Sequence, residues 1–474
     1  MNFLANNILF IYFFPTLAVF VAFLAHFVKY SISSNKVMLF SIISSLFELI
    51  ISTSLIHTFI FDKNIEPFSN SISWFNISNL NISLGILIDK FSSVFLLILF
   101  IIAIIVQIFS FILLKNDKNI NLYFGFVNLL ILTMTALILS SNYIQTVILA
   151  IIAGMNFYLI MNFHYDKINV SKYAKKFFII DKFGDFCLLA SVFIFIYFIN
   201  AYELSFNSEL LGYKELTDLS ANLYVYMSDT NFYSFNSLVL LGIMAKSGIF
   251  PFHVKHLLAC YQYSPLCYLI NFSMAIIAGI LTFRLLPVFD LSEKTVYIIF
   301  ILCAVTVLYS LIYGIINKIF IKKEFSYMAY ALLSIMFMVL PITGISHSDY
   351  PNSIEKILFI LLFIALCYSI LTSVLIYIYK KPEYIQCRAD KELVFDNVFD
   401  WFADNIFDIP RNIIKVVDKN ILPILTNSIG YSARFMSWAI SVFQNGKIQS
   451  YLLYSTLFIS MILILYLIFA MGGI

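Results

Sequence analysis

The stretch LVLLGIMAKSGIFPFHV, residues 238–254, places one lysine inside a long apolar run. A charged residue at the centre of a bilayer costs about 2.5–3.5 kcal/mol on insertion scales, so Lys246 is a candidate functional residue by default. Gly242, Gly248 and Pro251 flank it, and such residues beside a charge are typical of the broken helices at transporter ion sites. The stretch therefore predicts a membrane span with a break and a buried lysine.

The whole chain has the composition of a membrane protein. Its 474 residues are 62% hydrophobic and 12% charged, whereas soluble domains are about 25% charged. This excludes a soluble enzyme or a disordered regulator, and the net charge of +3 is too small for a nucleic-acid binder. Cysteines and histidines show no metal, haem or iron–sulfur spacing, and no glycine-rich nucleotide motif occurs, so we expect no cofactor and no metal on this chain.

Twelve apolar runs are long enough to cross a bilayer, which takes about 20 residues as a helix. We expect spans at 8–29, 37–61, 91–114, 121–141, 144–163, 174–199, 235–258, 265–286, 295–317, 325–345, 357–379 and 451–470. Membrane strands would be shorter and would alternate polar with apolar residues. The chain is therefore predicted to be an all-α polytopic membrane protein.

Lysines in alternate loops predict the orientation of these spans. The lysine-rich set of loops contains Lys29, Lys36, Lys115, Lys118, Lys167, Lys172, Lys175, Lys176, Lys255, Lys318, Lys322 and Lys323. Acidic residues gather in the other set. By the positive-inside rule the first set is cytoplasmic, which places both termini on the outer side, the periplasm of a bacterial inner membrane.

The segment 381–447 interrupts the apolar pattern. Asp396, Asp400, Asp404 and Asp408 recur every four residues and so form one acidic stripe along a helix, with apolar residues between them. We expect a lateral amphipathic helix on the cytoplasmic face. The acidic stripe favours protein partners over anionic lipid; the alternative is a solvated helical linker.

Few polar groups lie at membrane depth besides Lys246. Asp181 and Asp185 are one turn apart in FFIIDKFGDFCLL, residues 177–189, and Asp185 is a candidate ion-pair partner for Lys246. The alternative is that both aspartates lie at the water-exposed end of their helix. Because burial disfavours the charged form, a buried lysine can release its proton and so carry protons. The alternative for Lys246 is a lysine neutralised by a fixed acidic partner, with a purely structural role. Asn156 and Asn271 cannot titrate, but they can form hydrogen bonds between helices.

These landmarks, in this order, resemble subunit L of bacterial NADH-quinone oxidoreductase, a relative of mitochondrial NADH dehydrogenase subunit 5. The similar segments are ISLGILIDKFSSVFLLILF (82–100), KKFFIIDKFGDFCLLAS (175–191), GIMAKSGIFPFHVKHLLA (242–259), SPLCYLINFSMAIIAGILTFRL (264–285), IKKEFSYMAYALLSIMF (321–337), VFDNVFDWFADNIFDIP (394–410) and QNGKIQSYLLY (444–454). The resemblance implies an antiporter-like bundle of inverted repeats, with Lys246 at the family's key lysine and the lateral helix of that subunit.

The chain also departs from the family. The family's fifth span carries a buried glutamate that pairs with the key lysine, and Ile151 stands at or near that place here; Asn271 stands where the family has a histidine. The chain is shorter by about four spans. We therefore divide it into N-terminal spans (1–120), a first antiporter-like half (121–290), a truncated second half (291–380), the lateral helix (381–447) and a last span (448–474).

The leading functional hypothesis is a membrane subunit that supports proton-coupled electron transfer from NADH to quinone and carries no redox centre. By resemblance its proton path includes Lys246 and Asp185, with Asn271, Asn156 and Lys322 as further polar positions. The expected partners are the lipid bilayer and other membrane subunits of a complex I-like or antiporter assembly, not nucleic acid. Two alternatives stay open: a subunit of a multi-subunit sodium/proton antiporter, or a degenerate paralogue with a structural role.

Overall fold

The computed structural model describes residues 2–27, 33–61, 68–77, 80–114, 119–163, 168–201, 229–260 and 264–285, together with isolated positions elsewhere. The chain divides into two units, Met1–Asp400 and Trp401–Ile474, and every element named below belongs to the first. Apart from isolated positions, the four predicted spans after residue 290 and the predicted lateral helix lie outside the described residues, and so does Lys322.

Each of the first eight predicted spans corresponds to helix in the structure. The helices are α1 (Asn2–Phe27), α2 (Ser34–Phe61), α3 (Lys90–Leu114), α4 (Ile120–Ile138), α5 (Tyr143–Met161), α6 (Ile168–Ala201), α8 (Asp229–Ser247), α9 (Val254–Cys260) and α10 (Ser264–Arg284). The seventh span is divided between α8 and α9, so the predicted break near Lys246 is confirmed. Within the part of the chain that the structure describes, four segments are long and apolar enough to cross a membrane: Ser34–Thr58, Lys90–Ile112, Ile120–Ile138 and Tyr143–Met161.

The prediction that the chain is all-α is wrong between α2 and α3. Strands β1 (Phe68–Ile77) and β2 (Leu80–Ile88) form an antiparallel pair in which Phe68 lies opposite Ile88. The sequence of β2 alternates apolar and polar residues from Leu80 to Gly85, the period of a strand. The pair is held to the turn between α4 and α5, because the Leu87 amide donates to the Leu139 carbonyl at 2.8 Å.

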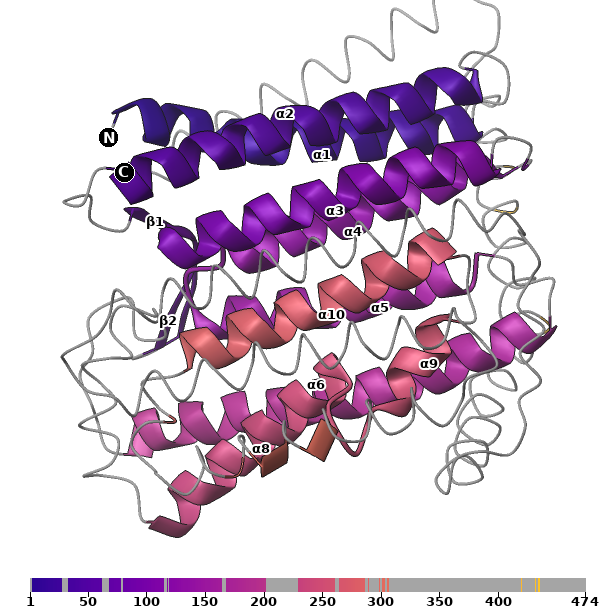
Figure 1. Cartoon of the computed structure of the whole chain (residues 1–474). Helices are drawn as coiled ribbons and strands as arrows, with labels where there is room; N and C mark the ends of the chain where they lie inside the picture. The colour runs from indigo at the N-terminus through magenta and orange to yellow at the C-terminus, as the bar shows by residue number, and fades with distance from the viewer. Residues whose placement is uncertain are drawn as a thin grey trace, which may run out of the picture. The chain divides into compact units, whose positions relative to one another are not determined.

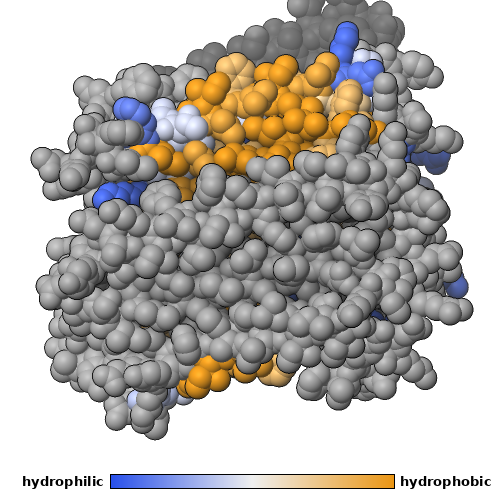
Figure 2. Space-filling model, viewed as in Figure 1, coloured by the Kyte–Doolittle hydropathy of each residue, from blue (hydrophilic) through white to orange (hydrophobic). Residues whose placement is uncertain are grey.

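The helices of the first unit run side by side, with α1 and α2 at one edge and α6 and α8 at the other (Figure 1). Helix α2 packs on α1, α3 and α4; α5 packs on α4 and α6; α6 packs on α8. Figure 2 shows apolar residues gathered over α1 and α2. The exposed side chains of these two helices include Phe20, Ile43, Phe47 and Ile50. These helices therefore direct apolar side chains outward, as a lipid-facing surface requires.

Two glycines allow α6 and α8 to approach closely. A Cβ atom on Gly184 of α6 would lie 3.0 Å from the Ala245 Cβ and 3.2 Å from the Gly242 carbonyl oxygen of α8. A Cβ atom on Gly242 would lie 2.6 Å from the Leu188 Cγ. Small residues are common where membrane helices cross at short distance. This crossing brings the aspartates of α6 to Lys246.

Asp89 joins the start of α3 to the end of α10. One carboxylate oxygen accepts a hydrogen bond from the Ser92 amide at 2.7 Å, which caps the N-terminus of α3. The other oxygen lies 2.6 Å from Arg284 Nη1. The ion pair thus fixes α10 against the N-terminal helices, beside the helices that carry Lys246.

Candidate functional site: a buried lysine–aspartate chain

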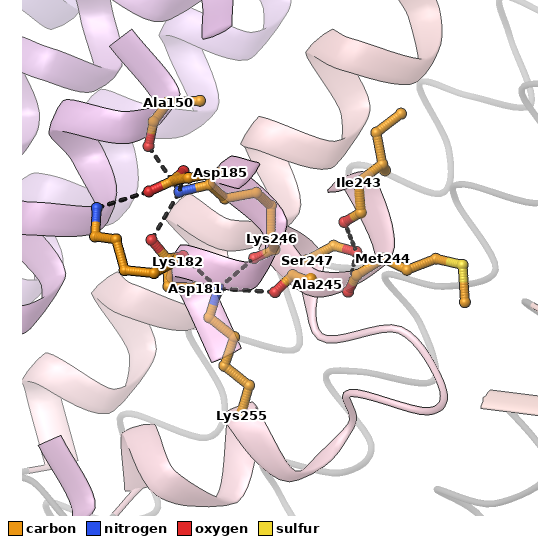
Figure 3. A network of polar contacts seen from close by, with 10 residues as sticks. All are labelled: Ala150, Asp181, Lys182, Asp185, Ile243, Met244, Ala245, Lys246, Ser247 and Lys255. Atoms are coloured by element: carbon orange, nitrogen blue, oxygen red, sulfur yellow. Dashed lines mark hydrogen bonds and ion pairs between the residues drawn. The ribbon is translucent and has the colours of Figure 1, made fainter. Parts of the chain in front are cut away.

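Lys246 lies fully buried between two carboxylates of helix α6 (Figure 3). Its Nζ is 2.7 Å from Asp181 Oδ2 and 2.5 Å from Asp185 Oδ1. Nζ also donates to the Ala150 carbonyl oxygen of α5 at 3.0 Å. A buried ammonium group needs such partners, because desolvation without them costs several kcal/mol. Three helices therefore supply the surroundings of one lysine.

Lys255, on α9, is a second fully buried lysine in the same place. Its Nζ is 2.6 Å from Asp181 Oδ1, so the two oxygens of Asp181 bind two different lysines. The ammonium group also lies 4.8 Å from the centre of the Phe177 ring, in cation–π geometry. Asp185 is shared in the same way, because its second oxygen lies 2.6 Å from Lys182 Nζ. The charges therefore alternate along a chain, which we call the lysine–aspartate chain: Lys255, Asp181, Lys246, Asp185 and Lys182.

The break after α8 makes a binding place for Lys255. Gly248 has φ of 71°, and the Ile249 amide donates to the Met244 carbonyl at 3.0 Å, the bond of a Schellman C-terminus. The last carbonyls of a helix lack intrahelical donors and carry partial negative charge. Lys255 Nζ donates to two of them, Ala245 O at 3.0 Å and Lys246 O at 2.9 Å. The turn at Gly248 thus returns Lys255 to the helix end that carries Lys246.

Gly154 of α5 has no side chain, and this leaves room for the lysine–aspartate chain beside α5. A Cβ atom at this position would overlap Asp181 Oδ2 and lie 2.8 Å from Lys246 Nζ. Gly154 is one turn after Ala150, whose carbonyl oxygen accepts from Lys246. The face of α5 toward Lys246 therefore offers a bare backbone and no carboxylate. Asp181 and Asp185 of α6 supply the negative charge beside Lys246.

We expect Gly154→Ala to disrupt the chain of charges, since its methyl group needs the volume of the Asp181 carboxylate. Proton uptake by proteoliposomes containing the full chain should fall, and the thermal midpoint of unfolding should fall with it. Gly125→Ala is the matched control: the atoms nearest to its methyl group would be those of the Phe23 ring, at 3.1–3.3 Å, and this ring lies at the end of a side chain that can shift. Equal uptake by the two variants would contradict the assignment.

The structure decides between the two interpretations of Asp181 and Asp185. The predicted ion pair between Lys246 and Asp185 is present, and the alternative of a water-exposed helix end is wrong, because Asp181 is 0% and Asp185 4% exposed. Counting Lys255 among the cytoplasmic loop lysines was also wrong. Lys255 follows the helix break and Lys246 precedes it, so the sequence does not indicate that the two lysines lie together. The sequence therefore did not predict Lys255 as a member of the site or Asp181 as the carboxylate that both lysines share.

The further polar positions that the sequence predicts lie on neighbouring helices. Asn156 of α5 is buried, and its Nδ2 donates to Thr133 Oγ1 of α4 at 3.1 Å, a hydrogen bond between helices. Asn271 of α10 is buried and donates to Cys267 Sγ at 3.3 Å, within the same helix. Their place in a proton path stays a prediction.

Two family models match this sequence. The model described as NADH:quinone oxidoreductase/Mrp antiporter, TM matches residues 140–380, which include the whole lysine–aspartate chain. The chain belongs to the NADH:quinone oxidoreductase/Mrp antiporter family. The model of complex I chain 5 N-terminus matches residues 74–124. Members of this family are antiporter-like integral membrane subunits, and the resemblance inferred from the sequence is confirmed.

Curated relatives of this antiporter family member include chloroplastic NAD(P)H-quinone oxidoreductase subunits 5. The one from Chaetosphaeridium globosum is 29% identical over 273 residues, 57% of this chain and 39% of the relative. The one from Physcomitrium patens is 31% identical over 235 residues, 49% of this chain and 32% of the relative. The chain therefore matches about two fifths or less of the length of these two relatives.

One solved structure shares the fold of the chain. It is a chain of the membrane-bound sulfane sulfur reductase, an archaeal respiratory membrane complex, with a TM-score of 0.62. The match covers 78% of this chain and 70% of that chain at 13% identity. The antiporter-like helical fold of this chain thus occurs in a respiratory membrane complex.

Proposed function

We propose that this antiporter-like subunit moves protons across the membrane as part of an assembly that transfers electrons from NADH to quinone. The burial of Lys246 between Asp181 and Asp185 carries the proposal. Burying a charged lysine within a membrane costs free energy, and ionisable residues in such places mark ion pathways. Lys246 is the proton carrier, and both aspartates set its charge. Electron transfer takes place on other subunits.

Competition for shared carboxylates gives Lys246 a way to change its charge. Asp181 faces both Lys246 and Lys255, and Asp185 faces both Lys246 and Lys182. When either aspartate turns toward its other lysine, the ammonium form of Lys246 loses stabilisation and its proton can leave to water or a neighbouring acceptor. When the aspartate returns, Lys246 takes up a proton again. For net proton transport across the membrane, Lys246 must release its proton toward one side of the membrane and take up the next proton from the other side.

The same geometry favours a working subunit over a degenerate paralogue. The paralogue hypothesis has three grounds: the absent carboxylate of the fifth span, Asn271 in place of a histidine and the shortened second half. The structure bears on the first of them. Asp181 occupies the space in front of Gly154 and binds the same lysine. A carboxylate is therefore available to Lys246, although another helix supplies it.

A sodium/proton antiporter is the second candidate, because the matching family model covers both NADH:quinone oxidoreductases and Mrp antiporters. Affinity purification of the tagged full chain separates the two. Co-purification of subunits that oxidise NADH, with NADH-driven proton uptake by the same membranes, supports our proposal. Sodium sensitivity on deletion of the gene, with normal NADH oxidation, would support the antiporter instead.

The orientation remains part of this proposal. Lys176, also counted with the loop lysines, is buried in α6. Without Lys255 and Lys176, the remaining lysine-rich loops still place the predicted cytoplasmic side as before, with both termini on the periplasmic side of a bacterial inner membrane. The relatives named above are chloroplastic, so the membrane of residence is part of the test. Labelling of a cysteine introduced at Lys172, which is exposed on α6, by an impermeant reagent would report the side.

A further inference from the structure

A second carboxyl group is buried in the N-terminal helices. Glu48 is 1% exposed and stands near the middle of the 28-residue helix α2. Five polar residues in the middle of α2 recur with helical spacing and are buried: Ser41, Ser44, Ser45, Glu48 and Ser52. Apolar residues of the same helix, among them Ile43 and Phe47, are exposed. Helix α2 therefore turns a polar face into the protein and an apolar face outward.

Amide side chains from two neighbouring helices meet this polar face. Ser45 Oγ donates to Gln107 Oε1 of α3 at 3.0 Å, and Gln107 Nε2 donates to Asn128 Oδ1 of α4 at 3.1 Å. Asn128 Nδ2 then donates to Ser41 Oγ at 2.8 Å, which returns the network to α2. Both amide oxygens thus accept hydrogen bonds, and the network joins three helices as a satisfied polar unit.

Glu48 is not satisfied in the same way. Ser44 Oγ donates to Glu48 Oε1 at 3.0 Å. Glu48 Oε2 is buried and has no hydrogen-bond partner among the residues that the structure describes. An ionised carboxylate would leave this oxygen without a donor in an apolar place, which is strongly unfavourable. A proton on Oε2 removes the charge.

Among the residues that the structure describes, the lysines of α2 and of the helices packed on it stand far from Glu48 along their helices. Helix α2 packs on α1, α3 and α4. In these four helices the titratable side chains besides Glu48 are Tyr12, His26, Lys36, His57, Lys90 and Tyr123. Lys36, on the same helix, is twelve residues away, about 18 Å along the axis. Lys90 begins α3, seventeen residues before Gln107, and the Tyr123 hydroxyl is paired with Ser110 Oγ at 2.6 Å.

We propose that Glu48 is a second proton-binding site of this chain, at which the carboxylate takes up a proton on Oε2 and becomes a neutral carboxylic acid. The inference rests on the proposed function, because a proton-moving subunit gives this proton a source and a destination. Sodium fits less well: it requires several oxygen ligands, and here one carboxylate oxygen is free while the amide oxygens of Gln107 and Asn128 already accept hydrogen bonds.

Infrared difference spectroscopy on proteoliposomes of the full chain tests the site. We expect a carbonyl stretching band of a protonated carboxyl group that shifts in D₂O and is lost in Glu48→Gln, which keeps the shape of the side chain but cannot bind the proton. In Lys246→Ala the band should remain. Failure of the proposed function is thus distinguishable, since it concerns transport through Lys246 and leaves the band in place.

Three results would overturn the inference. One is a spectrum that Glu48→Gln leaves unchanged, and another is a band that does not shift in D₂O, because the proton would then be absent or unable to exchange. The third is loss of the band on adding sodium at constant pH, which would make the site a sodium site. Glu48→Gln proteoliposomes should also take up protons more slowly than wild type with equal folded yield, and equal uptake would show that exchange at Glu48 plays no part in transport.

Discussion

We expect Lys246→Ala to abolish proton uptake by proteoliposomes or vesicles that contain the full chain. The expected fall is about 100-fold or more, the usual loss when a positioned proton-transfer group is removed. Alanine also leaves Asp181 and Asp185 buried with fewer cations, and breaking a buried ion pair in this way costs about 3–5 kcal/mol. Uptake must therefore be normalised to folded protein, measured by size-exclusion chromatography in detergent.

Lys246→Arg separates the loss of charge from the loss of proton transfer. Arginine keeps the positive charge between the two aspartates but stays protonated in proteins. We expect its folded yield to approach that of wild type while uptake stays as low as in Lys246→Ala. Lys172→Ala, at an exposed position of α6, is the control and should transport normally. Normal uptake by either Lys246 variant would refute the role of Lys246.

Asp181→Asn should have the second largest effect. Asp181 binds Lys246 through one oxygen and Lys255 through the other, at 2.7 and 2.6 Å. Asparagine has nearly the same shape but no charge, so both lysines lose a carboxylate at once. Removing one partner of a buried pair costs about 3–5 kcal/mol. We expect a lower thermal midpoint and a loss of uptake in the surviving folded protein.

Asp117→Asn is the matched control, because Asp117 lies half-buried between α3 and α4 and outside the lysine–aspartate chain. Its uptake and thermal midpoint should stay close to those of wild type. If Asp181→Asn behaves like this control, Lys255 does not depend on Asp181, and the shared carboxylate does not regulate Lys246.

Local signals in the sequence predicted Lys246 and the helix break. One lysine in an apolar run is visible without knowledge of the fold, and so are the glycines and the proline beside it. The partners are not local. Which face of α6 meets α8 depends on the close crossing at Gly184 and Gly242, and the return of Lys255 depends on the turn at Gly248.

The resemblance to the family directed attention to the fifth span, where Ile151 stands at or near the expected glutamate. The residue of α5 that faces the chain of charges is Gly154, and its missing side chain is the feature that matters. A residue that acts by leaving space is hard to recognise in one sequence. Only the position of Asp181 in the structure gives it meaning.

Two further features, the strand β2 and the buried Glu48, leave signals in the sequence but were not predicted from it. The alternation from Leu80 to Gly85 indicates a strand, but it is short and passes into the uniformly apolar end of β2, residues 86–88. Glu48 lies in the interior of the second predicted span, among serines at helical spacing. The filter that selected Lys246, an ionisable residue inside a span, selects Glu48 as well.

The order of charges in the lysine–aspartate chain bears on how many protons it can release at one time. The chain begins and ends in lysine, with Lys255 buried at one end and the Lys182 side chain 27% exposed at the other. With every group ionised, three positive charges face two negative ones, an excess of one. Release of a single proton from Lys246 makes the set electrically neutral, whereas release of a second would leave uncompensated negative charge in a medium of low dielectric constant. The arrangement thus suits the exchange of one proton at a time.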